Sequence, residues 1–203
     1  MNVELFGASG TLGSAVQKAL EVKGHEVIGI TRKSGKFRAD IQDIESLRAV
    51  YKQIGSFDHV ACAAGDVFPA PLEQTTDEQW ANSFKSKAMG QINLVRAAIP
   101  FITDKGSFTL VSGVLTDEVT FAATIGTTNN YTVEGFVKDA AFELPRGLRI
   151  NCVSPTVLTE SKAYHQYFPG FIPVDASEVA QAYVRAISNP MSGRILKLHK
   201  TDS

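Results

Sequence analysis

The chain has 203 residues, of which 44% are hydrophobic and 20% are charged, a composition typical of one globular domain with a sizeable core. Lys and Arg number 20 against 21 Asp and Glu, so the formal charge of −1 gives no global attraction to nucleic acid or to an anionic membrane. No long apolar segment and no basic leader is present, which predicts a cytoplasmic protein without a membrane span. We expect a single domain over residues 1–203 that binds a small molecule.

The two cysteines, Cys62 and Cys152, each lie in an apolar run that predicts a buried strand. A thiol in such a place behaves as a small hydrophobic group, so both are expected to be free. The four histidines are scattered and share no ligand spacing with the cysteines. No metal site is expected.

The N-terminal stretch predicts a strand over 3–6, a glycine turn over 7–13, a helix over 14–20 and a second strand over 25–31. Glycine lets the backbone approach a ligand closely, and the helix N-terminus behind it carries free N–H groups and partial positive charge. Phosphate is the expected ligand, although glycine turns also join strands to helices without binding anything. The candidate phosphate-binding residues are Gly7, Ser9, Gly10, Thr11, Leu12 and Gly13.

Two cations, Arg32 and Lys33, follow the second strand. In dinucleotide-binding folds an acid at this place meets the 2′-hydroxyl of the adenosine ribose, whereas a base accommodates a 2′-phosphate. The absence of an acid and the presence of two bases favour NADP over NAD. The alternative is a solvated basic turn, since Arg and Lys are common on loops.

The rest of the chain continues the alternation of strands and helices. Further strands are predicted over 36–41, 58–65, 107–112, 148–153 and 194–198, and helices over 44–54, 76–99, 122–144 and 177–188. This order predicts an α/β fold of the Rossmann type, doubly wound, with a mostly parallel sheet of about seven strands and helices on both faces. Residues 159–175 have no clean period and are either a flap over a substrate or an ordinary surface loop.

With these motifs in this order, the chain resembles the short-chain dehydrogenase/reductase family over nearly its whole length. The resemblance rests on the glycine turn 7–13, on Asp40, on the Cys-Ala-Ala-Gly turn 62–65 and on the segment 149–155. It implies a Rossmann-fold oxidoreductase that uses NAD(H) or NADP(H). The resemblance further implies that Asp40 and Ile41 contact the adenine, Ala63, Ala64 and Gly65 the adenosine ribose, and Pro155 and Thr156 the nicotinamide. The family commonly has glycine at the position of Thr156.

The resemblance also locates the family's catalytic asparagine, serine, tyrosine and lysine, whose positions here hold Lys87, Gly113, Gly126 and Asn130. None of the four matches, and two glycines supply no side-chain donor for a developing alkoxide. Three nearby residues are candidate substitutes: Ser112, Tyr131 and Lys87. Tyr131 is expected to point about 140° around the helix from residue 126, at about 100° per residue, so Ser112 is the better candidate. The alternative for all three is a packing or surface role.

Two functions are therefore open. One is an atypical NADP(H)-dependent oxidoreductase acting on a small carbonyl or alcohol, and the other is a catalytically inactive dinucleotide-binding or sensing protein. The resemblance also implies a homodimer or homotetramer through the two long helices, 77–99 and 122–144.

Overall fold

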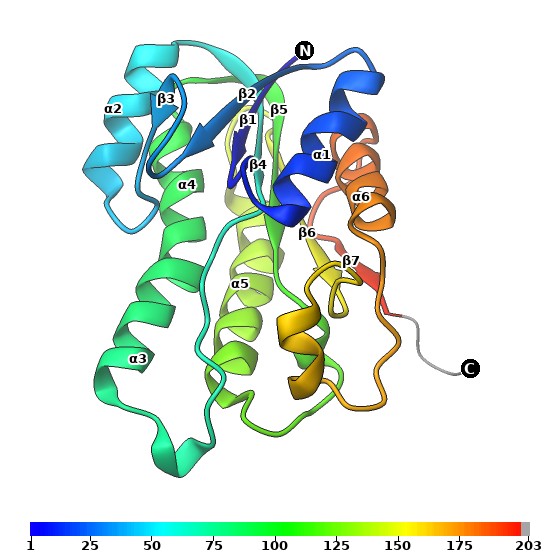
Figure 1. The fold of residues 1–203 in the computed structure, drawn as a ribbon. Coiled ribbons are helices and arrows are strands. Elements are labelled where there is room, and N and C mark those ends of the chain that lie inside the picture. The colour runs from blue at the N-terminus through cyan, green and yellow to red at the C-terminus, as the bar shows by residue number, and fades with distance from the viewer. Residues whose placement is uncertain (200–203) are drawn as a thin grey trace.

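In a computed structural model, which describes residues 1–199, the centre of the molecule is a seven-stranded parallel sheet (Figure 1). The strands are β1 (Asn2–Phe6), β2 (Glu26–Thr31), β3 (Phe37–Arg38), β4 (Phe57–Cys62), β5 (Ile102–Val111), β6 (Arg149–Pro155) and β7 (Ile195–Leu198). Their order in the sheet is β3-β2-β1-β4-β5-β6-β7, and every pairing is parallel. The predicted α/β doubly wound fold is confirmed, and the sheet is parallel throughout.

Helices cover both faces of this sheet, as Figure 1 shows. They are α1 (Thr11–Val22), α2 (Ile44–Ile54), α3 (Asp77–Ser83), α4 (Gly90–Ala98), α5 (Thr124–Glu143) and α6 (Ala176–Ser188). Helices α1 and α6 pack together on one face, and α2, α4 and α5 cover the other. Among residues 1–199, no helix combines the length and apolarity that crossing a bilayer requires.

The two cores follow from the alternation of side chains along β1. Val3 and Leu5 point to the face covered by α1 and α6, whereas Phe6 points to the other face. There Phe6 meets Tyr51 of α2 with ring centroids 5.7 Å apart, and Tyr51 is 5.1 Å from Phe57 of β4. The sheet is thus buried on both faces, which holds the carboxyl ends of its strands in fixed positions.

Several strands differ from their predicted bounds by two residues or more: β4 ends at Cys62, β6 ends at Pro155, and β3 and β5 differ as well. The third covers only Phe37–Arg38, because the chain turns at residue 40, where the Asp40 carboxylate accepts a hydrogen bond from the Gln42 backbone N–H at 3.0 Å. β5 begins at Ile102, five residues earlier than expected, and its pairing with β4 is irregular between Phe57 and His59. Apolar periodicity does not reveal this irregularity, since the inserted residues are polar.

The predicted helix over 76–99 is interrupted. It begins at a capping box made by Thr76 and Gln79, and a π-helical segment, η2 (Phe84–Met89), separates α3 from α4. The wider turn buries Ser86 and Lys87 together, although both are polar. Segments of this kind are frequent at functional sites.

The segment 159–175 is less irregular than expected. It contains a short 3-10 helix, η4 (Lys162–Tyr167), and Leu158 and Val174 at its ends form an isolated parallel bridge. The predicted free thiols are confirmed, since Cys62 and Cys152 are both unpaired and buried.

Candidate functional site

The glycine turn after β1 has a geometry that only glycine permits. Gly7 has a φ of +83°, and a Cβ added at Gly13 would lie 2.0 Å from the Gly7 carbonyl oxygen. The first turn of α1 therefore packs directly on the turn that precedes it. Its N-cap residue, Gly10, provides no side-chain cap, whereas Asp43 caps α2 with its side chain. The first N–H groups of α1 are thus left for an anion.

A cavity of about 320 Å³ opens at this turn, at the carboxyl ends of β1, β2 and β4. In the sheet, β2 lies on one side of β1, whereas β4 and then β5 lie on the other side. The cavity therefore lies where the strand order reverses, as in dinucleotide-binding folds. Of the residues predicted to bind the cofactor, this cavity is lined by Gly7, Ser9, Gly10, Arg32, Asp40, Ile41, Ala63, Ala64 and Gly65. Thr11, Leu12 and Gly13 form the first turn of α1 behind it. Lys33 is not among the lining residues.

A second cavity, of about 210 Å³, lies beyond Gly65 and is called here the inner cavity. It is lined by Val67, Lys87, Ser112, Gly113, Val114, Leu115, Gly126, Asn130, Pro155, Thr156, Val157, Leu158 and Phe168. Ser86, which lines the first cavity, and Lys87, which lines the second, are neighbours in η2. The two cavities therefore lie next to each other, and the predicted nicotinamide contacts fall in the inner one.

Lys87 is the one acidic or basic side chain among the residues that line the inner cavity. It is 8% exposed, and its Nζ donates a hydrogen bond to the Ser112 carbonyl oxygen at 3.3 Å. Burial lowers the pKa of the Lys87 ammonium group below its ordinary value. η2 thus holds a buried lysine side chain at the wall of the cavity.

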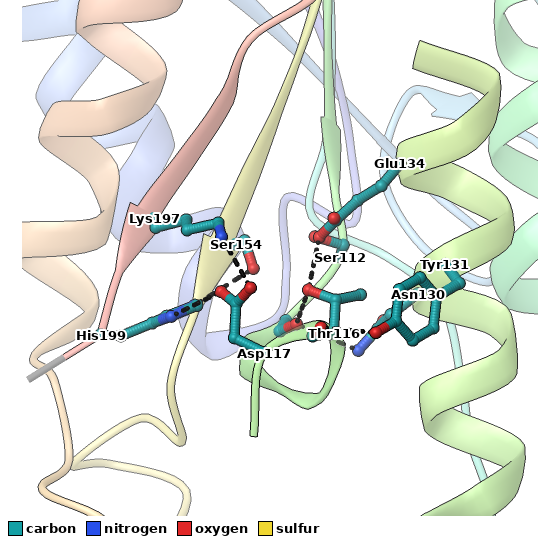
Figure 2. A network of polar contacts seen from close by, with 10 residues as sticks. Ser112, Thr116, Asp117, Asn130, Tyr131, Glu134, Ser154, Lys197 and His199 are labelled. Carbon is teal, nitrogen blue, oxygen red and sulfur yellow. Dashed lines mark hydrogen bonds and ion pairs between the residues drawn. The ribbon is translucent and has the colours of Figure 1, made fainter. Parts of the chain in front are cut away.

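The other family positions behave differently. Gly113 and Gly126 contribute no donor, and the Asn130 amide donates to the Gly113 carbonyl oxygen at 3.4 Å. Figure 2 shows that the Ser112 hydroxyl is turned to Glu134, whose Oε1 accepts hydrogen bonds from Ser112 at 2.7 Å and from Thr116 at 3.0 Å. Ser112 reaches the inner cavity, but its hydroxyl proton is already used.

Tyr131 is placed away from the inner cavity. Its side chain is 57% exposed, and its hydroxyl donates to the Thr116 carbonyl oxygen at 2.7 Å (Figure 2). It borders instead a separate surface depression beside β7. Of the three candidate substitutes, Lys87 and Ser112 line the inner cavity, and Tyr131 does not.

Pro155 and Thr156 form part of the inner cavity at the end of β6. The Thr156 backbone N–H donates to the Leu198 carbonyl oxygen at 3.2 Å, but the Thr156 Oγ1 is buried and has no hydrogen-bond partner among residues 1–199. A buried hydroxyl without a partner costs free energy unless a ligand satisfies it. A nicotinamide bound here would supply the missing partner through its amide, so these residues fit the cofactor that the fold implies.

Sequence analysis missed several residues of these cavities. Asp66 and Val67 follow β4 and could have been found from their place at a strand end, whereas Ser86 gave no local signal. Phe168 lies in the segment 159–175, for which a flap over a substrate was one of the two predictions. It also missed a polar network, in which His199 contacts Asp117 through Nδ1 and Ser154 through Nε2, each at 3.2 Å (Figure 2). Ser154 is completely buried, whereas Asp117 borders the depression beside β7, so this network joins the end of β7 to the loop before α5.

Known proteins are similar to this chain over most of its length. Residues 9–190 match the family model described as enoyl-(acyl carrier protein) reductase. An uncharacterised oxidoreductase of Methylorubrum extorquens is 28% identical over 178 residues, covering 76% of this chain and 72% of that protein. An uncharacterised oxidoreductase of Staphylococcus epidermidis is 20% identical over 91% of this chain and 89% of its own length.

Solved structures agree with this match. The protein lin1944 from Listeria innocua is 42% identical, with a TM-score of 0.95 over 98% of this chain and all of that one. A small-chain dehydrogenase in complex with NADPH is 25% identical, with a TM-score of 0.88 over 98% of this chain and 96% of that one. The family match, the glycine turn and the cavity where the strand order reverses all agree. The chain therefore belongs to the short-chain dehydrogenase/reductase family of oxidoreductases.

Proposed function

We propose that the protein is an NADP(H)-dependent oxidoreductase that interconverts a small carbonyl compound and its alcohol, with Lys87 as the proton donor. The observation that carries the proposal is that, within the part of the chain that the structure describes, Lys87 is the one acidic or basic side chain lining the inner cavity. The family match supplies the reaction class, and the similar dehydrogenase in complex with NADPH supports the cofactor.

The dinucleotide is held by the chain's own groups at both ends. The N–H groups at the start of α1 bind its phosphates, Arg32 meets the 2′-phosphate, and the Thr156 hydroxyl bonds the nicotinamide amide. Once bound, the reduced nicotinamide supplies the hydride that the carbonyl carbon accepts.

Reduction of a carbonyl also needs a proton at the oxygen, because the alkoxide that develops there is unstable in an apolar cavity. The Lys87 ammonium group gives that proton and becomes a neutral amine, and solvent restores it. A lowered pKa makes this ammonium a stronger acid than an exposed lysine. The Asn130 amide, which also donates to the Gly113 carbonyl oxygen, is a further donor at the same cavity.

The decisive test removes the ammonium group from Lys87. Lys87→Met is expected to lower kcat for reduction about 100-fold or more, in the range of general acid catalysis, with NADPH affinity nearly unchanged. The wild-type rate should fall as the pH rises through the pKa of Lys87, since only the charged form donates. Lys85→Met is the matched control, because Lys85 lies in the same π-helical segment but is exposed. Full activity of Lys87→Met contradicts the assigned role.

The preference for NADP is tested at Arg32. Loss of one charge-assisted contact predicts that Arg32→Ala weakens NADPH binding about 10- to 100-fold and NADH binding hardly at all. Lys33→Ala should have a smaller effect, since Lys33 does not line the cavity. Exposed Lys52 on α2 provides a control, Lys52→Ala. Equal binding of the two cofactors by the wild type contradicts the assignment to Arg32.

A second candidate function is a catalytically inactive dinucleotide-binding or sensing protein. The observation that favours it is the absence of side-chain donors at Gly113 and Gly126 together with the engagement of the Ser112 hydroxyl by Glu134. Tight NADPH binding without turnover of any carbonyl compound, in the wild type as in Lys87→Met, would favour this function.

We also infer a cytoplasmic homodimer or homotetramer that associates through the long helices. Phe142 of α5 is 90% exposed, and Phe84 of η2 is exposed as well. Large apolar side chains on helix surfaces commonly mark contacts between subunits.

A further inference from the structure

An apolar cavity adjoins the inner cavity on the side away from the cofactor site. We call it the side pocket; its volume is about 90 Å³. It is lined by Val67, Phe68, Pro69, Leu115, Thr120, Phe121, Ala122, Ala123, Gly126, Tyr164, Tyr167 and Phe168. None of these residues is acidic or basic. The one threonine is not free to bind a ligand through its proton, because its hydroxyl donates to the Tyr167 carbonyl oxygen at 2.6 Å.

The side pocket and the inner cavity share four lining residues, Val67, Leu115, Gly126 and Phe168. These four residues line the place where the two cavities meet, which we call the passage. The passage is tight at Gly126, since a Cβ added there would lie 3.2 Å from Leu115 Cδ1 and 4.0 Å from Val67 Cγ2, so Leu115 would have to shift. A large side chain at this position would fill the space between the two.

The rim of the side pocket exposes apolar surface to water. Phe121 is 77% exposed, and Phe68 and Tyr164, which also line it, are each more than one third exposed. Exposed aromatic side chains around a small apolar pocket lose contact with water when they cover an apolar ligand, and this burial favours binding. The exposed rim and the apolar walls thus both favour an apolar ligand.

From this geometry we infer that the substrate is an uncharged carbonyl compound with one compact apolar group, about the size of a single ring, and that Gly126 sets this selectivity. The carbonyl oxygen lies at Lys87, and the apolar group passes Gly126 into the side pocket. A carboxylate or phosphate on that group has no cationic partner in the walls, so charged substrates of similar size are excluded. The inference rests on the proposed function for the position of the carbonyl.

Three probes test the inference by NADPH oxidation: benzaldehyde, which carries a ring; pyruvate, which carries a charge; and propanal, which has little to place in the side pocket. We expect kcat/KM for benzaldehyde to exceed that for pyruvate about 10-fold or more. Gly126→Leu should lower kcat/KM for benzaldehyde about 10-fold or more and for propanal less than about 3-fold. Equal or better use of pyruvate, or an equal loss with both aldehydes, overturns the inference.

The matched control is Gly135→Leu, in the same helix, where an added Cβ meets nothing within 4 Å; both rates should stay at the wild-type level. Because Gly126→Leu could fail to fold, Leu115→Ala provides an opposite change. It widens the passage and should raise kcat/KM for 2-naphthaldehyde relative to benzaldehyde, and an unchanged ratio counts against the inference.

A binding measurement separates this inference from the proposed function. Saturation-transfer NMR with benzyl alcohol and lactate, on protein loaded with NADP, needs no turnover. Transfer to benzyl alcohol alone, lost in Gly126→Leu, supports the side pocket even where reductase activity is absent. Turnover of pyruvate with no transfer to benzyl alcohol overturns the side pocket and leaves the reductase assignment standing.

Discussion

Glu4, in the middle of β1, is a buried carboxyl group without a partner. It is completely buried, and neither of its carboxylate oxygens has a hydrogen-bond partner among the described residues. By the alternation of β1 it shares the face of Phe6, whose ring contacts Tyr51. Burial raises the pKa of Glu4 from 4.5 to about 8, because the charged form loses its hydration.

The sign of the effect on stability follows from proton linkage. Between pH 4.5 and about 8 the folded protein keeps the Glu4 proton while the unfolded chain releases it. The free energy of unfolding therefore falls as the pH rises through this window and is level above it. One pKa unit corresponds to about 1.4 kcal/mol. Between about pH 5 and pH 7.5, Glu4 therefore lowers the free energy of unfolding by about 3 kcal/mol.

Glu4→Gln removes the titration with little change of shape. We expect urea unfolding at a series of pH values to show that the variant gains stability over the wild type as the pH rises, by about 3 kcal/mol at about pH 7.5 relative to about pH 5. The difference between the two proteins is the quantity to compare, since burial also lowers the pKa of His59, to about 4, and that group titrates alike in both.

Glu26→Gln is the control, because Glu26 lies on the adjacent strand β2 but is exposed. Its stability should follow the wild type at every pH. Parallel curves for the wild type and Glu4→Gln from about pH 5 to pH 8 would refute the reasoning, since a carboxyl already ionised in the folded state gives no such difference.

Two further predictions concern packing and assembly. Tyr183→Phe should cost about 1–3 kcal/mol in urea unfolding, because the Tyr183 hydroxyl donates to the buried Cys62 carbonyl oxygen at 2.7 Å, whereas Tyr131→Phe, at an exposed hydroxyl, should cost less than about 0.5 kcal/mol. In sedimentation velocity, Phe142→Asp should lower the sedimentation coefficient from that of an oligomer toward that of a monomer. Val22→Asp, at an exposed valine of α1, should leave it unchanged. A wild-type monomer, or an oligomer unaffected by Phe142→Asp, contradicts assembly through α5.

Much of the fold and of the first cavity could be predicted from the sequence because their signals are local. The glycine turn at 7–13 follows a short apolar strand and precedes an amphipathic helix, and turns of this kind meet the ligand through the backbone. The seven strands and the helices between them follow from apolar periodicity and from Gly and Pro at their ends. Of the boundaries that moved, those at β3 and β5 are where polar turns and an irregular pairing replace that periodicity.

The chemistry of the inner cavity could not be predicted in the same way. Ser112 is one residue from the family's serine position and was the better candidate, yet Glu134, 22 residues further along, accepts its proton. Lys87 is brought to the cavity wall by a π-helical segment that no periodicity indicated. The sequence around Glu4 does not distinguish it from other polar strand residues, because its burial results from the helices that cover that face of the sheet.

The sequence by itself therefore determined the order of the elements, the position of the glycine turn and the family, since each depends on neighbours along the chain. The tertiary structure alone decided which polar side chains line the inner cavity and how closely Gly126 approaches Leu115. The physical reason is that the direction and protonation of a buried side chain depend on burial and on partners from distant elements, here η2, β5, α5 and the segment after β6.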